Sequence, residues 1–239
     1  SRDKGGTISV TAYDQLRYLK NKDTYVYENM TANKLIEVMA SSFGLICGTL
    51  EDTGFSISRV EENKSWFDII LSALEVTIMN TGKMYVLYDE FGEITLKNIE
   101  NMKIPILIDN EVAENFDYST SIDSETYNQV KLYYKNQLVH VEKDDSNIAK
   151  WGVLQLSETI EEITENALNK AKTMLEQYNS KTRTLTVKNV LGDTRVRAGC
   201  SIGIYLSLGD MVANQYMLVE KCTHTFKENE HYMDLTMWL

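Results

Sequence analysis

The residues best suited to bind a metal lie near the C-terminal end of the sequence, where two histidines flank a short charged segment. His224 and His231 stand on either side of residues 225–230, and Cys222 precedes them. A symmetric hairpin here would set the histidines directly opposite each other, on the face that also carries Cys222. Imidazole and thiolate are common metal ligands, but no complete ligand set is evident. The simpler interpretation is two ring side chains paired across a hairpin, and we predict no metal or cofactor site.

A nucleophilic or acid–base site has little support in the sequence. Cys200 lies near Arg197, and a neighbouring guanidinium lowers the pKa of an exposed thiol. Cys200 also opens an apolar strand-like run, where cysteine usually packs as a small core residue, and no base stands out for it. His140 is alone, with Asp144 and Asp145 in the following turn, where aspartates usually cap backbone amides. We therefore predict no catalytic residues.

Paired carboxylates are the groups that wall-degrading glycosidases need. The chain has 35 acidic residues, so many candidate pairs of carboxylates could be chosen. No single pair is therefore a specific indication of a glycosidase. Glu161, Glu162 and Glu165 are better explained as charges at the start of a helix, where they favour the positive end of the dipole. Asp89 and Glu90 are better explained as turn residues.

Nucleotide-binding signatures are missing from the sequence, which contains neither GxxxxGK[ST] nor GxGxxG. Gly199 and Gly203 have GxxxG spacing, but they fall in a predicted strand, where glycine opens or kinks the backbone. The 14 tyrosines could form a stacking platform for sugars or nucleic acid, but such platforms come with a basic groove. Packing within strands is the simpler interpretation for those in strand candidates: Tyr85, Tyr88, Tyr133, Tyr134, Tyr205 and Tyr216.

Composition limits the partners further. The 239 residues include 24 basic and 35 acidic side chains, a net charge of −11. Phosphate binding needs clustered Lys and Arg, so we expect no stable nucleic-acid binding. The sequence has no apolar run of about 20 residues and no leader pattern, so we expect no membrane anchoring. Three cysteines, Cys47, Cys200 and Cys222, lack CxxC spacing, which favours free thiols in a reducing compartment.

The elements that must position these residues fall into two main groups, the first of which is a small α+β domain over residues 23–108. Thr31 and Asn63 are candidate N-caps of two helices, and Gly44 and Gly82 stand where helix-closing glycines belong. Residues 24–28, 45–49, 84–88 and 93–97 are strand candidates, the last two joined as a hairpin by residues 89–92.

Residues 109–239 predict a β-rich domain with one long helix. The single proline, Pro105, and a turn signal at Asp109-Asn110 place a boundary near residue 108. Several short strands with one helix favour a closed, barrel-like sheet or a sandwich. The helical stripe comprises Ile163, Ala167, Ala171, Met174, Leu175 and Tyr178, and the strand candidates are 127–134, 138–142, 152–156, 184–188, 200–207, 216–225 and 232–238.

Residues 1–22 form a third segment, with a strand-like run at 7–12 and a short helical stripe at Tyr13, Leu16 and Leu19. A strand at the very start needs a partner, which suggests a fragment of a longer protein. The overall prediction is a β-rich α+β fold, in which a small α+β domain precedes a β-barrel-like domain with one long helix.

Several long segments together resemble the XkdQ-like family of phage tail proteins, relatives of the late control D baseplate hub. They occur in the expected order and span essentially the whole chain. These segments are AYDQLRYLKN (12–21), NTGKMYVLY (80–88), SNIAKWG (146–152), GDTRVRAG (192–199), MLVEK (217–221), HTFK (224–227) and MDL (233–235).

The resemblance implies a structural baseplate hub in a contractile phage tail or a tail-like bacteriocin. In such a hub, three subunits with two similar β-barrels each form a ring that adapts the hexameric tail tube to the trimeric spike. Residues 109–239 would then be the second barrel, 23–108 an inserted domain, and 1–22 the remnant of the first barrel. No catalytic, cofactor-binding or metal-binding residue is implied.

The implied partners are the tail tube, spike, tape measure and baseplate wedge proteins, with two further copies completing a homotrimer. The implied location is the virion tail baseplate or a bacteriocin particle, assembled in the host cytoplasm. The alternative function is a peptidoglycan hydrolase component of the tail. Two further hypotheses follow. The net negative charge partly lines a channel, so that DNA or a protein tape slides through without sticking. Strand 7–12 pairs with the neighbouring α+β domain, pairs with another copy, or is loosely held.

Overall fold

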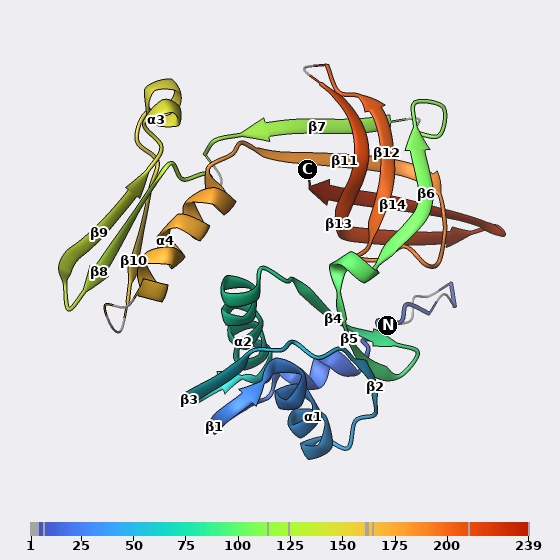
Figure 1. Cartoon of the computed structure of the whole chain (residues 1–239). Coiled ribbons are helices and arrows are strands. Elements are labelled where there is room, and N and C mark those ends of the chain that lie inside the picture. The colour runs from blue at the N-terminus through green and yellow to red at the C-terminus, as the bar shows by residue number, and fades with distance from the viewer. Residues whose placement is uncertain are drawn as a thin grey trace. The chain divides into compact units, whose positions relative to one another are not determined.

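The computed structural model describes residues 5–6, 8–113, 115–123, 125–160, 163, 165–209 and 211–238, without the side chains of 165–168 (Figure 1). The chain divides into two compact units, residues 1–102 and residues 103–239. The predicted β-rich α+β class is confirmed. Within the described ranges, every helix is too short or too polar to cross a bilayer.

The described residues of the first unit form two α-helices and two small sheets. β1 and β3 form an antiparallel ribbon, while the second sheet has the order β2-β5-β4. In chain order the elements are a 3₁₀ turn (Gln15–Lys20), β1 (Lys22–Thr31), α1 (Ala32–Ser42), β2 (Cys47–Leu50), β3 (Ser56–Ser65), α2 (Trp66–Thr81), β4 (Tyr85–Glu90), β5 (Glu93–Asn98) and a second 3₁₀ turn (Ile99–Asn101).

The core of this unit lies between the helices and the sheets. Leu35 and Met39 of α1, Ile69 of α2, and Ile94 and Leu96 of β5 are fully buried in one cluster. Full burial of one such side chain contributes roughly 1.5–3 kcal/mol. The apolar residues on one face of α1 and of α2 therefore pack both helices against the sheets.

The helix ends follow the predicted positions in part: Thr31 stands at the N-cap of α1 but its side chain makes no cap hydrogen bond, and the first N–H of the helix, that of Ala32, is instead accepted by Thr53 Oγ1 at 3.2 Å. Gly82 closes α2 in the left-handed region at φ 69°. The N-cap of α2 is Ser65, however, and Asn63 lies inside β3. Ser65 Oγ accepts the N–H of Asp68, whose carboxylate accepts the N–H of Ser65, and this reciprocal capping satisfies two amides that Asn63 is too far away to reach.

Two parts of the first unit differ from the expected strands. The expected strand at 7–12 is wrong over residues 8–12, where an isolated bridge at Ile8 is followed by irregular backbone, while residue 7 lies outside the described residues. β3 had no counterpart among the predicted strands because it is rich in charges. Its Glu61 is nevertheless only 1% exposed and pairs with Lys64 at 2.7 Å, which makes its burial tolerable.

The second unit contains two further sheets. One has six strands in the order β6-β12-β13-β14-β11-β7, and the other has the order β10-β8-β9. The elements are β6 (Lys103–Asp109), β7 (Asn115–Ser121), β8 (Gln129–Tyr134), β9 (Gln137–Lys143), α3 (Asp145–Trp151), β10 (Gln155–Thr159), α4 (Glu165–Tyr178), β11 (Thr182–Leu191), β12 (Ser201–Ser207), β13 (Val212–Lys227) and β14 (Glu230–Trp238).

The six-stranded sheet is bent but open, so the expected closed barrel is wrong. In Figure 1, β12 and β13 run at a steep angle to β7 and β11. β6 pairs only with β12, and β7 only with β11, among the described residues. The predicted boundary near residue 108 falls inside β6. One face of the sheet is fully buried at Leu185, Val187, Ile202, Ile204, Leu206, Met217, Val219, Met233, Leu235 and Met237.

The smaller sheet is covered by α4. Ala171, Met174 and Leu175 pack against Val130 and Leu132 in a separate core, which matches the predicted helical stripe. That stripe is wrong at its first residue, since Ile163 precedes the helix and is 56% exposed. Glu161 and Glu162 lie outside the described residues, as do the side chains of Glu165 and Ala167.

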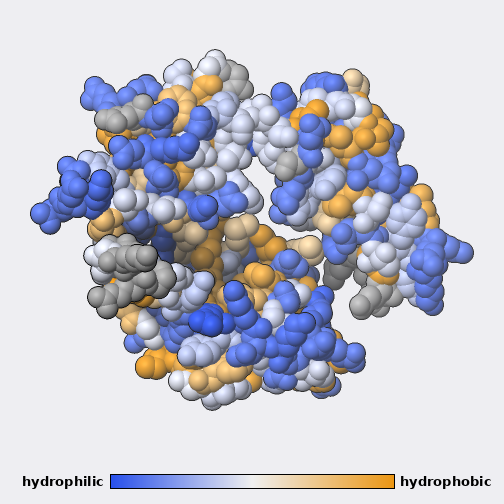
Figure 2. Space-filling view, turned by 180° about the vertical axis from the view of Figure 1, so that it is seen from behind, coloured by the Kyte–Doolittle hydropathy of each residue, from blue (hydrophilic) through white to orange (hydrophobic). Residues whose placement is uncertain are grey.

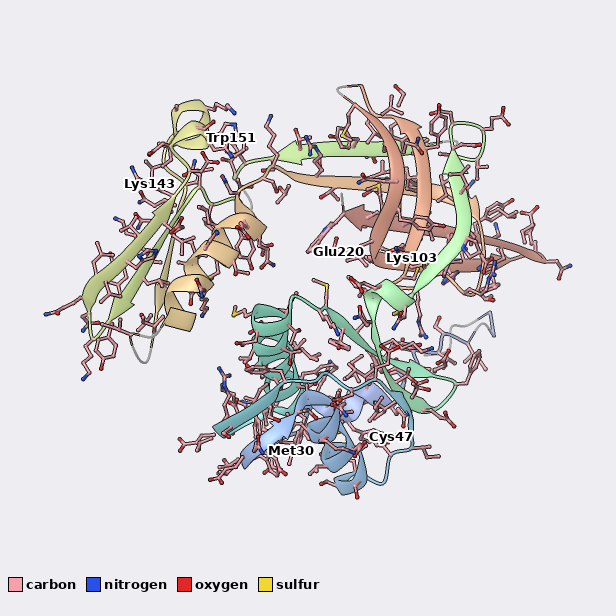
Figure 3. All side chains as sticks on the ribbon, in the orientation of Figure 1. Met30, Cys47, Lys103, Lys143, Trp151 and Glu220 are labelled. Atoms are coloured by element: carbon pink, nitrogen blue, oxygen red, sulfur yellow. The ribbon has the colours of Figure 1, made fainter. Side chains whose placement is uncertain are left out.

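α3 is a short helix that the sequence interpretation treated as a turn. Lys143 lies shortly before this helix and Trp151 is its last residue; both are labelled in Figure 3. Asp144 caps it by accepting the N–H groups of Ser146 and Asn147, so the predicted capping role of Asp144 is confirmed. A hydrogen bond from the Asn179 side chain, at 2.7 Å, is the main reason why the pKa of Asp144 lies below its usual value.

Candidate functional site: a histidine cluster that holds a loop

The register of the C-terminal hairpin differs from the expected one. Residues 228–229 form a two-residue turn with φ values of 53° and 68°, so that Lys227 faces Glu230 and Phe226 faces His231. His224 therefore faces Met233, and the predicted direct pairing of the two histidines is wrong. They are diagonal neighbours on one face of the hairpin, a separation that ring side chains can bridge.

The two imidazoles nevertheless meet. His224 Nδ1 lies 2.8 Å from His231 Nε2, and the other ring nitrogen, His224 Nε2, lies 2.8 Å from the carbonyl oxygen of Val196. Cys222 Sγ is 3.1 Å from the same Nε2. On its far side His231 stacks on Phe226, with ring centroids 4.0 Å apart.

These contacts fix the positions of the ring hydrogens. A carbonyl oxygen can only accept, so His224 Nε2 carries a hydrogen and donates it to Val196. In a neutral ring, His224 Nδ1 then has a lone pair and accepts from His231 Nε2. The two rings thus form a directed chain of hydrogen bonds from β14 through β13 to the segment between β11 and β12.

That segment, residues 192–199, is built around the rings. Gly192 donates its N–H to the carbonyl of His231 at 2.7 Å, and a Cβ at this position would overlap the His231 ring. Val196 is fully buried. The absence of a side chain at Gly192 is therefore what allows the loop to approach the hairpin.

The arrangement of Cys222, His224 and His231 does not suit a shared metal ion. Cys222 lies at the Nε2 edge of His224 and His231 at the opposite Nδ1 edge, so a single ion could not contact all three side chains. Within the described part of the chain, no three His, Cys, Asp or Glu side chains converge as metal ligands. Burial raises the pKa of Cys222 to about 11, which keeps it in the thiol form that metals bind poorly.

Each of the remaining chemical candidates has local partners of its own. Cys200 is 1% exposed, burial raises the pKa of its thiol, and its sulfur accepts the N–H of Arg197. His140 pairs with Glu142 at 3.1 Å. Asp89 accepts the Gln15 amide at 2.7 Å, as well as the N–H of Gly92 at 2.9 Å.

An exposed apolar surface was missed by the sequence interpretation. The outer face of the six-stranded sheet carries Leu107, Tyr205 and Tyr216, which are 56%, 50% and 50% exposed, and the ammonium of Lys103 lies 5.8 Å from the Tyr216 ring centroid. Figure 2 shows that exposed apolar residues occur in small groups among hydrophilic ones. Alternation along β12 and β13 is the signal that could have separated this outer face from the buried one.

The potential ligands and nucleophiles described above make hydrogen bonds within this chain, as His224, His231, Cys222 and Cys200 show. The sequence profile of the YQBQ-like family matches residues 1–238, and the chain belongs to that family. YqbQ of Bacillus subtilis (strain 168) is 29% identical over 237 residues, covering 95% of this chain and 72% of YqbQ. The phage-like element PBSX protein XkdQ of the same strain is also 29% identical, covering 96% of this chain and 72% of XkdQ. The predicted family resemblance is confirmed.

Two solved structures share the fold. The 43 kDa tail protein of prophage MuSo2 from Shewanella oneidensis superposes with a TM-score of 0.66 at 11% identity, covering 94% of this chain and 71% of that protein. A tail protein from Neisseria meningitidis MC58 gives the same TM-score of 0.66 at 12% identity, covering 95% of this chain and 72% of that protein.

Proposed function

We propose that this chain is a structural component of a phage tail or of a phage-like particle. The observation that carries the proposal is its similarity over nearly its whole length to XkdQ of a phage-like element, together with a fold shared with two tail proteins. The geometry is consistent with this role. The contacts of the histidine cluster are made within the chain, and the outer face of the six-stranded sheet has exposed residues available for contacts with neighbouring proteins.

Within the tail, we place the chain in the baseplate hub, where three copies adapt the hexameric tube to the trimeric spike. The segments that resemble the XkdQ-like family, a relative of the late control D baseplate hub, support this finer assignment. The predicted partners are the tube, spike, tape measure and baseplate wedge proteins. The open edges of the six-stranded sheet, β6 and β7, provide backbone groups through which neighbours can extend the sheet.

Particle assembly separates this proposal from a peptidoglycan hydrolase. The gene for the whole protein is deleted and complemented with the wild type or with a variant in which Asp89, His140 and Glu142 are replaced by Asn, Gln and Gln. For a structural role, deletion abolishes intact particles in electron micrographs, the variant restores them, and purified protein clears no cell-wall zymogram. Clearing that is lost in the variant would instead establish the hydrolase.

The acidic charge supports a further expectation within the same proposal. With a net charge of −11, an acidic lumen would repel DNA phosphates and let the genome pass without sticking. Neutralising the acidic side chains that face the lumen of an assembled particle should slow DNA ejection at low salt. A lumen lined by Lys and Arg would contradict this expectation.

A further inference from the structure

The two histidines connect the hairpin formed by β13 and β14 to loop 192–199. The hairpin contributes both rings, and the loop contributes the Val196 carbonyl and the Gly192 N–H. Val196 is fully buried, and Cys200, directly after the loop, is 1% exposed. Separation of the rings would therefore loosen the loop and expose apolar groups beneath it.

The geometry of the ring pair limits how many protons it can hold. With both rings neutral, the single hydrogen between the 2.8 Å pair of nitrogens belongs to His231 Nε2. One further proton can reside on His231 Nδ1, and the contact then becomes a stronger, charge-assisted hydrogen bond. A second proton must go to His224 Nδ1, which would place two N–H groups head to head and two positive charges side by side.

The groups around the pair supply a nearly constant field between pH 7.5 and pH 5. From the loop, Asp193 influences His231 and is held by Arg195 at 2.7 Å. The hydrogen bond from Arg195 is the main reason why the pKa of Asp193 is lowered to about 2, so this carboxylate stays charged. From β13, the Cys222 thiol, with a pKa of about 11, stays neutral.

The other charged neighbours are also fixed by partners. Asp234 of β14 accepts the N–H of Asn189 at 2.8 Å, and the loop also carries Arg197. At the hairpin tip, Lys227 and Glu228 lie 3.8 Å apart in solvent. The contact itself is made by the imidazole nitrogens, so any proton added to the pair changes the charge at the contact.

We propose that the His224–His231 pair is an acid-sensitive latch, which holds loop 192–199 closed near neutral pH and releases it when both rings are protonated. Opening takes up a proton that the closed pair cannot hold. Each proton taken up on opening raises the opening equilibrium about tenfold per pH unit once the closed state is saturated. The latch is a property of this chain and does not depend on the proposed role in a tail.

Amide hydrogen exchange of the full chain, followed by NMR at pH 7.5, 6 and 5 and corrected for intrinsic rates, tests the latch. We expect the Gly192 and Val196 amides to lose about tenfold or more protection at pH 5, while the Ile94 amide of the first unit keeps its protection. Ring nitrogen shifts should show hydrogen on Nε2 of both histidines at pH 7.5. Unchanged loop protection at pH 5, or Nδ1–H on a neutral His224, would overturn the proposal.

Two substitutions at one position separate the latch from general acid sensitivity. His231→Gln keeps a polar group at the ring, and its amide can donate to neutral His224 or, after flipping, accept from protonated His224. The loop should then stay protected at pH 7.5 and at pH 5. His231→Phe keeps a ring but has no donor, so protection should be low at both pH values. If the Gln variant loses protection in acid as the wild type does, the latch is excluded.

Discussion

At the scale of single residues, polar side chains bind backbone groups that lie outside the strands of the sheets. Asn128 is fully buried, donates to the carbonyl of Gly152 at 2.7 Å and accepts the N–H of Leu154 at 2.8 Å. His224 plays the same role between Val196 and His231. In both cases one side chain satisfies two partners, which makes each residue hard to replace.

Asn128→Ala should destabilise the second unit by about 1–3 kcal/mol, because it removes the two hydrogen bonds that the fully buried Asn128 side chain makes with the Gly152 carbonyl and the Leu154 N–H. The free energy of unfolding in urea measures the effect. Gln155→Ala is the matched control, since its side-chain bond to Gln129 is exposed and its loss should cost less than about 0.5 kcal/mol. Equal costs for the two variants would contradict the assigned role of Asn128.

Gly192→Ala should cost about 1–3 kcal/mol, because the new Cβ would overlap the His231 ring and force the loop or the ring to move. The same substitution should cost much less in a His231→Ala background, where the ring is gone. A double-mutant cycle measures this coupling. Additive costs would show that Gly192 is required for another reason.

The ion pair of Asp193 predicts a specific acid response. The hydrogen bonds from Arg195 lower the pKa of Asp193 from 3.8 to about 2, so the stabilisation is present above about pH 4 and is lost as the pH falls toward 2. In Arg195→Gln, an NMR titration of the Asp193 carboxyl should move upward toward pH 3.8. A midpoint that stays near 2 would mean that Arg195 is not the cause.

At the scale of elements, the sequence predicted best where local chemistry decides the structure. Helices α1 and α2 have apolar stripes, and Gly82 closes α2 as its position indicates. The hairpins β4–β5 and β13–β14 were also predicted from alternating runs around short turns. Each of these features is encoded within a few neighbouring residues, so sequence alone suffices for them.

The elements that escaped prediction depend on distant partners. β3 carries Glu61, Glu62 and Lys64 and becomes a strand because β1 pairs with it along its length. β6 contains Pro105, a residue tolerated at the edge of a sheet, where β12 is its parallel partner. The contact of His224 with His231 was likewise foreseen only in part, since its register depends on a two-residue turn, and the Val196 carbonyl that completes it comes from a remote loop.

Ser65→Ala should destabilise the first unit by about 1 kcal/mol, since it removes the reciprocal cap of α2. Thermal unfolding followed by circular dichroism measures the change. Asn63→Ala is the informative comparison, because Asn63 is not the cap. If Asn63→Ala cost more through loss of helix α2, the assignment of Ser65 would be wrong.

At the scale of the whole molecule, two units have separate cores and both lack a converged reaction site among the described residues. Leu35 belongs to the core of the first unit, while Val187 lies on the buried face of the six-stranded sheet in the second unit. In the proposed tail role, the chain would act through the surfaces that it offers to neighbouring proteins. The exposed side chains of Leu107, Tyr205 and Tyr216 are candidates for the apolar part of such a contact surface.

Separate cores predict separate responses to damage. Leu35→Ala should cost about 2–5 kcal/mol in the first unit and lower the calorimetric transition of that unit alone. Val187→Ala should lower only the transition of the second unit. A single transition that shifts as a whole in both variants would show that the units unfold as one.

Electron cryomicroscopy of the native particle that carries the full-length protein tests the account most directly. We predict that residues 8–238 fit a density present in three copies at the junction of tail tube and spike, with side chains from the outer face of the six-stranded sheet or its open edges in contact with neighbouring subunits. A particle in which this chain is missing from the tail, or is bound there around a cleaved sugar or peptide, would contradict the central claim.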